Sequence, residues 1–345
     1  MTTATRPAGT PPPAWADGLL VCRQIHDATA DVRTFALEPT EPRLFRHDPG
    51  QFLTLLLDID GAQVERCYTI SSPPTRPDLL TITVKRVPGG LVSNWLHDHL
   101  VPGGTVWARG PLGDFSIARH PAPKYLFLSA GSGVTPLMSM TRALYDLAHA
   151  VDVVFVHSAR SFDDIIFRRE LEFIATVAPH IRVTHLLDDR GEQLSAALLQ
   201  ELAPDLLERE VFTCGPGGYM ESVRDMLSAT GFPPARYHEE SFTFEPAAGT
   251  APEGATGRTA FKVEFARTGR TVDCDPSTTV LAAASRAGIT LPASCAQGMC
   301  GTCKTTLLSG RVDMQHNGGI RPREIAADKI LLCSSKPLDD LVIDG

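Results

Sequence analysis

Hydrophobic positions in the first third of the chain occur as short, mostly alternating runs. They cover residues 51–59, 79–87 and 105–110, and Pro and Gly separate them. Short strands of this kind, broken by turn residues, are typical of an antiparallel β-barrel. We therefore predict a barrel domain over residues 20–119.

The pattern changes near residue 120, where continuous apolar runs begin to alternate with helical stretches. The runs have the length of buried strands and cover 125–131, 151–158, 181–187 and 210–215. A helix predicted to start at Pro136 carries apolar side chains on one face, namely Leu137, Met140, Leu144 and Leu147. Strands that alternate with helices predict a parallel sheet, so residues 120–244 should form an α/β domain.

Composition changes again after this domain. Residues 245–258 are rich in Ala, Gly, Pro and Thr without an apolar period, which predicts a linker. Residues 259–345 then show a strand, a turn, a strand and a helix that carries Val280, Leu281 and Ala284. The first nineteen residues lack the apolar core of a secretory signal and are predicted to be a disordered lead-in. The sequence shows no run of eighteen apolar residues, so we expect no membrane association and a cytoplasmic location.

Four of the eight cysteines have a spacing that suits iron–sulfur ligation. They form C-x4-C-x2-C-x29-C and are Cys295, Cys300, Cys303 and Cys333. This is the plant-type [2Fe–2S] spacing, with three thiolates from one loop and the fourth from a distant segment. Gly298 and Gly301 would let backbone amides approach the sulfur atoms. A structural zinc site is the alternative, although such sites usually pair one C-x2-C with another.

Charge is spread unevenly along the chain. The net charge is −8, yet residues 259–345 hold 10 Lys and Arg against 9 Asp and Glu. An acidic chain is poorly suited to nucleic acid, so we expect no such partner. Basic residues near the cysteine loop either dock an acidic acceptor or form a solvated surface; they are Lys304, Arg311, Arg321 and Arg323.

Two stretches of the predicted barrel carry candidate ligand-binding residues. Residues 66–69 read R-C-Y-T at the end of a predicted strand, and Gly89, Gly90 and Ser93 open a short helix. Free amides at a helix N-terminus bind pyrophosphate. By itself R-x-Y-T also fits an ordinary strand with an exposed Arg, and the second stretch also fits a plain turn capped by Ser93.

The R-x-Y-T stretch resembles the signature of the ferredoxin–NADP reductase superfamily, and residues 110–115 are similar to its barrel-closing segment. The resemblance implies that Arg66 meets a flavin phosphate, that Tyr68 packs on the isoalloxazine, and that Thr69 faces flavin N5 as a catalytic residue. The pyrophosphate element implies FAD rather than FMN. The residues expected to bind FAD are Arg66, Cys67, Tyr68, Thr69, Lys85, Gly89, Gly90, Val92, Ser93, Thr135 and Phe242.

Residues 131–136 carry G-x-G-x-x-P after the first predicted parallel strand. Two glycines alone are a poor dinucleotide fingerprint, but the stretch is similar to the G-x-G-x-T-P form of the same superfamily. Residues 212–220 resemble the second half of this signature, which implies that Cys214 is a catalytic residue beside the nicotinamide. Pro136 would be the first helical residue, where its missing N–H costs nothing. The residues expected to bind NAD(P)H are Gly131, Gly133, Ser158, Arg160, Cys214, Gly215 and Pro216.

Two further expectations concern the ends of predicted strands. In residues 157–164, Ser158, Arg160 and Ser161 could bind a 2′-phosphate, whereas Asp163 and Asp164 would discourage one. We therefore expect NADH, with NADPH as the alternative. The resemblance also implies that Glu240 and Phe242 lie against the flavin ring.

As a whole, the chain resembles a flavin reductase with a C-terminal plant-type ferredoxin domain of β-grasp fold. It is similar in particular to reductase components of Rieske-type oxygenases that act on betaine-like quaternary ammonium compounds, and to the reductase of hybrid-cluster protein. The resemblance implies that electrons pass from NAD(P)H through FAD and the [2Fe–2S] cluster to a terminal oxygenase, a monooxygenase or demethylase, or to another one-electron acceptor protein. A nicotinamide gives two electrons together and the cluster takes one, so FAD must stand between them.

Other functions remain open at this point. They are reduction of hybrid-cluster protein or another acceptor, and a non-catalytic electron-transfer or redox-sensing role in a larger complex. The nicotinamide signature at 214–220 favours turnover. In residues 333–337, C-S-S-K-P stands where many relatives carry a second cysteine, so Cys333 is the one candidate ligand of that segment.

Overall fold

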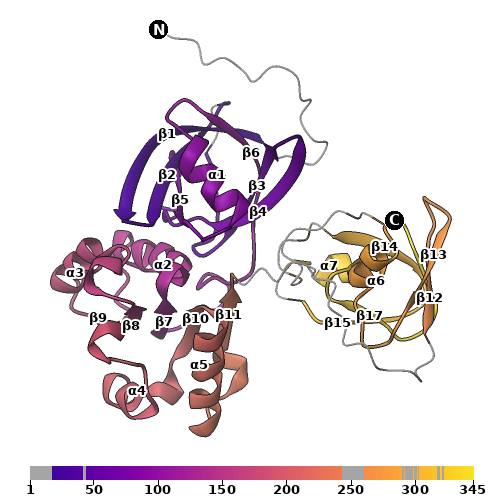
Figure 1. Ribbon diagram of the computed structural model, residues 1–345. Helices are drawn as coiled ribbons and strands as arrows, with labels where there is room; N and C mark the ends of the chain where they lie inside the picture. Colours follow the sequence, from indigo (N-terminus) through magenta and orange to yellow (C-terminus); the bar gives the residue numbers. More distant parts are fainter. Residues whose placement is uncertain are drawn as a thin grey trace. The chain divides into compact units, whose positions relative to one another are not determined.

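The computed structural model describes residues 18–41, 44–242, 260–289, 291, 298, 301, 303–316, 319–320 and 322–345 (Figure 1). The chain divides into two compact units, the first mainly before Thr243 and the second mainly from Phe244 onward. The predicted linker 245–258 and residues 1–17 of the predicted lead-in lie outside the described residues. Gly18 and Leu19, also assigned to the lead-in, belong to the first strand instead, because that strand pairs along its whole start.

The first unit begins with a six-stranded antiparallel sheet of order β4-β3-β6-β1-β2-β5. Its elements are β1 (Gly18–Thr29), β2 (Val32–Pro39), β3 (Phe52–Ile59), β4 (Ala62–Thr69), β5 (Leu80–Lys85), α1 (Leu91–His99) and β6 (Thr105–Leu112). Ile70, directly after β4, bridges Ile82 of β5, so the two ends of the strand order meet. Alternate residues of β3, Leu53, Leu55 and Leu57, enter the enclosed core. The predicted antiparallel barrel is confirmed.

The same unit continues with a five-stranded parallel sheet of order β11-β10-β7-β8-β9. Its strands are β7 (Lys124–Ala130), β8 (Asp152–Ala159), β9 (Ile181–Leu187), β10 (Glu210–Gly215) and β11 (Tyr237–Ser241). Its helices are α2 (Val134–Asp146), α3 (Arg168–Val177), α4 (Ala196–Leu202) and α5 (Gly217–Ala229). All four predicted apolar runs are strands, and the α/β prediction is confirmed.

Helices cover both faces of the parallel sheet, which is why its strands are apolar throughout (Figure 1). Helix α2 starts at Val134 rather than at the predicted Pro136; Pro136 still lies in the first turn, where backbone N–H groups have no intrahelical partner. Leu137, Met140 and Leu144 are buried as predicted. Leu147 follows the end of the helix and is 53% exposed, so its predicted place on the apolar face was wrong.

The second unit contains the ferredoxin-like sheet, of order β13-β12-β18-β14-β16, with a separate β15–β17 pair. Its strands are β12 (Phe261–Phe265), β13 (Arg270–Cys274), β14 (Lys304–Ser309), β15 (Val312–Met314), β16 (Lys329–Leu331), β17 (Ser335–Pro337) and β18 (Leu341–Ile343). Its helices are α6 (Val280–Arg286) and α7 (Pro322–Ile325). The side chains of Val280, Leu281 and Ala284 on α6 pack into the core, as predicted.

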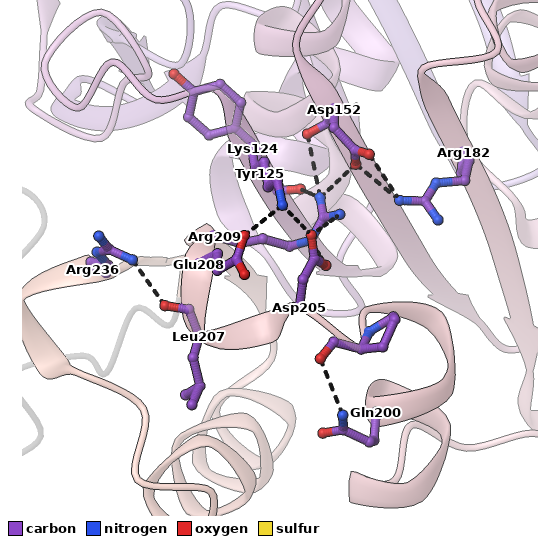
Figure 2. Close-up of polar contacts among 11 residues, drawn as sticks. Lys124, Tyr125, Asp152, Arg182, Gln200, Asp205, Leu207, Glu208, Arg209 and Arg236 are labelled. Carbon is purple, nitrogen blue, oxygen red and sulfur yellow. Dashed lines mark hydrogen bonds and ion pairs between the residues drawn. The ribbon is translucent and has the colours of Figure 1, made fainter.

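A network of ion pairs closes the amino-terminal edge of the parallel sheet (Figure 2). Arg209, 1% exposed, donates to Asp205 Oδ1 at 2.7 Å, to Asp152 Oδ1 at 2.6 Å and to the Tyr125 carbonyl at 3.0 Å. Lys124 also binds Asp205. Burial opposes ionisation of Asp205, but hydrogen bonds from Arg209 and Lys124 outweigh it and lower its pKa to about 2. Arg209 thus ties the starts of β7, β8 and β10 together.

We expect Arg209→Met to destabilise the full-length protein by about 2 kcal/mol, because the buried Tyr125 carbonyl loses its guanidinium donor and Asp152 and Asp205 each lose one of two cationic partners. Urea unfolding followed by circular dichroism measures this change. The Asp205 contribution to wild-type stability is complete above the ordinary carboxyl pKa and is lost as the pH falls towards 2.

The matched control is Arg182→Met. Arg182 also binds Asp152, but its side chain is 50% exposed, so its loss should cost less than about 1 kcal/mol. Equal losses of unfolding free energy in the two variants would show that Arg209 does not hold the network together.

Candidate functional site

The carboxyl ends of the parallel strands meet in a tight backbone contact. A Cβ atom on Gly133 would lie 2.2 Å from the Cys214 carbonyl oxygen, and one on Gly215 would lie 2.9 Å from the Tyr219 ring. Only glycine fits at Gly133, so the loop from β7 to α2 rests directly on the end of β10. The structure therefore brings together Gly131, Gly133, Cys214 and Gly215, which the sequence had assigned to the nicotinamide.

Beside this contact lies a group of buried polar side chains. Cys214 pairs in register with Glu240 on β11, and the two are 0% and 4% exposed. Burial raises the Cys214 pKa well above its usual value, and the Glu240 carboxyl adds to the rise. Burial also raises the Glu240 pKa to about 8, while Thr69 opposes this rise. Glu240 is therefore mostly neutral at pH 7.

Two polar atoms of this group are poorly satisfied by the described residues. Thr69 Oγ1 and Glu240 Oε2 are buried and lack a close hydrogen bond there, although the Thr69 hydroxyl interacts with the Glu240 carboxyl and opposes the rise of its pKa. Buried polar atoms are almost always paired in folded proteins. A poorly satisfied hydroxyl and carboxyl at the junction of barrel and sheet fit a polar ring system that binds there, as the predicted flavin site requires.

A cavity of about 440 Å³ opens at the same end of the sheet, within the first unit. Its walls include five residues that the sequence assigned to cofactors: Lys85, Gly131, Ser158, Arg160 and Pro216. The Tyr219 hydroxyl, also in the wall, is buried and interacts with the Ser158 side chain of the same wall. The size and the mixed polar and apolar lining suit a nucleotide ligand.

Arg160 is held by carboxylates at this cavity. Its Nη2 donates to Asp31 Oδ2 at 3.1 Å and to Asp164 Oδ1 at 2.8 Å, and Ser161 donates to Asp164 at 2.9 Å. Asp31, from the barrel, also lies 3.6 Å from Lys85. Burial opposes ionisation of Asp31, but Lys85 and other neighbours lower its pKa. The Asp31 carboxylate therefore remains charged at neutral pH.

One expectation about this cavity needs correction. Asp163 does not line it, but points to a second cavity of about 690 Å³ beside Arg142 and Arg168. Asp163 and Asp164 are neighbours in the short helical turn Phe162–Asp164, but Asp164 lines the first cavity and Asp163 lines the second. Sequence reasoning also missed Asp31 and Tyr219, since a lone turn residue of the barrel carries no motif and only folding brings Asp31 to the sheet.

The other predicted FAD residues lie along β4, α1 and the first turn of α2. Gly89 has φ 71°, Gly90 precedes the first turn of α1, and Ser93 accepts the Val87 amide at 3.2 Å. Val92 is 2% exposed inside the barrel core, so its side chain cannot reach a ligand and only its amide could. The free amides of this turn fit a pyrophosphate.

The remaining positions of this set are as follows. Tyr68 packs against the barrel core, and Arg66 donates to the Glu65 carbonyl at 2.7 Å. Cys67 is partly exposed, Thr135 is buried with its hydroxyl on Ser132 O at 3.1 Å, and Phe242 is partly buried against the sheet core.

In the second unit, two of the predicted cluster cysteines are described. Cys303 and Cys333 are 4% and 7% exposed; the Cys333 amide donates to Cys303 Sγ at 3.4 Å, and the Gly298 amide donates to Cys333 Sγ at 3.1 Å. Cys295 and Cys300 lie outside the described residues. Buried sulfur atoms that accept backbone amides suit thiolates bound to iron.

The loop glycines are required by their surroundings. Gly298 has φ 70°, and a Cβ there would lie 2.9 Å from His316 Cα; Gly301 has φ 71°, with Gly319 O at 2.7 Å. Of the basic residues near this loop, Lys304 binds Glu324 at 2.8 Å and Arg311 binds Asp339 at 2.9 Å. Arg321 and the side chain of Arg323 are not among those described.

Three family models match consecutive parts of the chain. An oxidoreductase FAD-binding domain matches residues 20–117, an oxidoreductase NAD-binding domain residues 127–225, and a 2Fe-2S iron-sulfur cluster binding domain residues 263–338. Each of the three predicted domains is therefore matched by a family model for the cofactor that was expected there. They define an oxidoreductase that uses FAD, NAD(H) and a [2Fe–2S] cluster.

Comparison with whole proteins identifies the family. The chain is 45% identical to the glycine betaine monooxygenase reductase subunit of Pseudomonas aeruginosa, over 96% of each chain. It is 42% identical to the stachydrine N-demethylase reductase subunit of Rhizobium meliloti, over 96% of this chain and 98% of that one. The crystal structure of phthalate dioxygenase reductase shares its fold, with a TM-score of 0.60 at 24% identity, covering 95% of this chain and 97% of that one.

The chain belongs to the family of oxygenase reductase components that contain these three domains. It passes electrons from NAD(P)H through FAD and the [2Fe–2S] cluster to an oxygenase partner, and the alternatives of another acceptor or a non-catalytic subunit are not favoured. Within the described part of the chain, no helix is long and apolar enough to cross a membrane.

We expect Gly298→Ala to lower the iron and sulfide content of the full-length protein several-fold. The new methyl group would meet the His316 backbone and require a left-handed conformation, so the amide would move away from Cys333 Sγ. Iron analysis and visible absorbance measure the loss. Gly288→Ala is the control, since Gly288 has a similar φ of 69° but open space around it. A fully loaded Gly298→Ala protein would contradict the assignment of this loop.

Proposed function

We propose that the oxygenase partner is the terminal component of a monooxygenase or demethylase that acts on a quaternary ammonium compound of the betaine type. The carrying observation is the 45% identity over 96% of both chains with a glycine betaine monooxygenase reductase subunit. The relative named for stachydrine demethylation supports the same substrate class. The oxygenase would be of Rieske type and take one electron at a time, and the reaction would run in the cytoplasm without nucleic acid.

The experiment is a reconstitution with the purified terminal oxygenase subunit of glycine betaine monooxygenase. With NADH present, the protein should reduce that oxygenase and support formaldehyde release from glycine betaine. Reduction of ferricyanide without any reduction of the oxygenase would refute the proposed partner class and leave the reductase chemistry intact.

We propose that Arg66, Tyr68 and Thr69, with the first turn of α1 after Gly89 and Gly90, hold FAD. When bound, FAD accepts a hydride and releases electrons singly, and the cluster carries one electron at a time. Thr69 would orient the flavin through its buried hydroxyl. Ser93 would fix the loop before α1, since it accepts the Val87 amide, and Val92 would offer only its amide.

We propose further that NAD(P)H lies in the 440 Å³ cavity, with the nicotinamide end towards Cys214. The close contact between Gly133 and Cys214 would exclude water there, and the first turn of α5 after Pro216 would face the nucleotide's phosphates. Cys295, Cys300, Cys303 and Cys333 would ligate the cluster. The domain boundaries would fall after residues 119 and 244, with the linker 245–258 before the ferredoxin-type domain.

NADH should be the preferred donor, because Arg160 is occupied by Asp31 and Asp164 and both carboxylates would repel a 2′-phosphate. In Asp31→Asn/Asp164→Asn, we expect the ratio of kcat/KM for NADPH to that for NADH to rise by about tenfold, equivalent to ~1.4 kcal/mol. Steady-state reduction of ferricyanide with each nucleotide measures the ratio.

Asp163→Asn is the matched control, since Asp163 lines the other cavity and should leave the ratio unchanged. A wild-type preference for NADPH, or an equal shift in the control, would contradict the assignment of the ribose site.

Cys333→Ser should remove the cluster while leaving the flavin site untouched. We expect ferricyanide reduction to persist and electron transfer to the oxygenase to fall by more than about tenfold, because the one-electron carrier is lost. Cys274→Ser controls for removal of a buried thiol in the same domain, since Cys274 is 0% exposed and outside the ligand spacing. Unchanged transfer to the oxygenase in Cys333→Ser would mean that the cluster is not the exit.

A further inference from the structure

One polar stripe of α2 contacts the segment that directly follows Thr69. We propose that Ser139, Arg142 and Asp146, here called the α2 clamp, are positioning residues that set the alignment of the flavin side of the site with the nicotinamide side. The inference rests on the proposed role of Thr69. None of the three side chains belongs to the expected cofactor sites.

The clamp residues lie on one face of α2, three and four positions apart, and all bind the same short segment. Ser139 Oγ donates to the Ser72 carbonyl at 2.8 Å, and Arg142 Nη1 donates to the Ser71 carbonyl at 2.6 Å. Asp146 accepts from Arg76 at 2.6 and 2.9 Å. Two of these contacts are to main-chain carbonyls, so they fix the path of the backbone and not merely a side chain.

Arg142 is the most constrained member of the clamp. Its side chain is 11% exposed, and its remaining donors bind Glu170 of α3 in bidentate fashion at 2.8 and 2.6 Å. Its guanidinium also lies 4.7 Å from the centre of the Phe167 ring. Because the planar guanidinium contacts the Ser71 carbonyl, Glu170 and the Phe167 ring at the same time, it is held more rigidly than the guanidinium of an exposed surface ion pair.

The α2 clamp connects the two sides of the predicted reaction site, the flavin side at Thr69 and the nicotinamide side at Cys214. Ser71 is two residues from Thr69, whose hydroxyl is buried and makes no close hydrogen bond among the described residues. Helix α2 begins directly after Gly131–Gly133, and Gly133 rests on the Cys214 backbone. Because α2 is one continuous helix, Arg142 and Ser139 transmit the position of the Cys214 end to Thr69.

Hydride transfer is sensitive to small misalignments of the reacting groups. A looser clamp should therefore slow the step without changing how well either nucleotide binds. In full-length protein loaded with FAD and the cluster, we expect Arg142→Met to reduce the flavin about tenfold more slowly in rapid mixing with NADH, with the half-saturating NADH concentration unchanged.

A second measurement follows the backbone itself. Amide hydrogen exchange of residues 70–76 should be faster in Arg142→Met than in the wild type, since the Ser71 carbonyl loses its guanidinium partner. Arg142→Lys can still donate to that carbonyl but cannot bind Glu170 in bidentate fashion, so both readouts should lie between those of the wild type and of Arg142→Met. Arg182→Met removes an arginine of β9 that does not contact the clamp, and it should change neither readout.

The inference is overturned if Arg142→Met leaves both the exchange of residues 70–76 and the rate of flavin reduction at wild-type values. It is also overturned if Arg182→Met gives the same changes. Should Arg142→Met fail to fold, Arg142→Lys and Asp146→Asn carry the same test: faster exchange with slower reduction supports the clamp, and wild-type values refute it.

Failure of the clamp and failure of the proposed site can be told apart with Thr69→Ala. If Thr69→Ala slows flavin reduction while the clamp variants do not, only the clamp is refuted. If Thr69→Ala also leaves flavin reduction unchanged, the proposed role of Thr69 is wrong as well.

Discussion

The first unit depends on one close approach, the contact of Gly133 with the carbonyl of Cys214. A single methyl group at residue 133 would collide with that backbone, so this contact fixes how the loop after β7 packs on the end of β10. The start of α2 and the end of β10 are thereby joined at the place where parallel sheets bind nucleotides. The proposed cofactor sites and the α2 clamp all depend on this contact, because it fixes the start of α2 relative to the end of β10.

Most helices and strands could be predicted from the local sequence, because hydrophobic period and turn residues act over short distances. The alternating run of β3 and the apolar runs of β7 and β8 each became strands, and Cys303 and Cys333 are buried in the same core. The spacing of the thiols could be read directly, since a cluster imposes its own geometry on the chain.

What the sequence could not show is which side chains from separate elements meet. Asp31 lies in a turn of the barrel but binds Arg160 of the sheet domain, at a sequence separation that no short motif covers. Asp163 and Asp164 are neighbours in sequence, yet the helical turn between them sends them to different cavities. Val92 stands in the first turn of the helix that is proposed to bind FAD, but its own side chain belongs to the barrel core. Tertiary packing decided each of these cases.

The two edges of the parallel sheet differ in how their polar groups are satisfied, and this difference separates structure from chemistry. At the amino-terminal edge, Arg209 binds two carboxylates and a carbonyl, so its burial is compensated (Figure 2). At the carboxyl end, Thr69 Oγ1 and Glu240 Oε2 are buried and lack a close hydrogen bond among the described residues. Leaving such atoms unsatisfied lowers stability, and a fold tolerates this where a ligand supplies the missing partners. These two groups lie where the barrel and the sheet meet, and the Arg209 network lies at the opposite ends of the strands. The groups proposed to contact the flavin are therefore separated from the network that supports the sheet by the length of its strands.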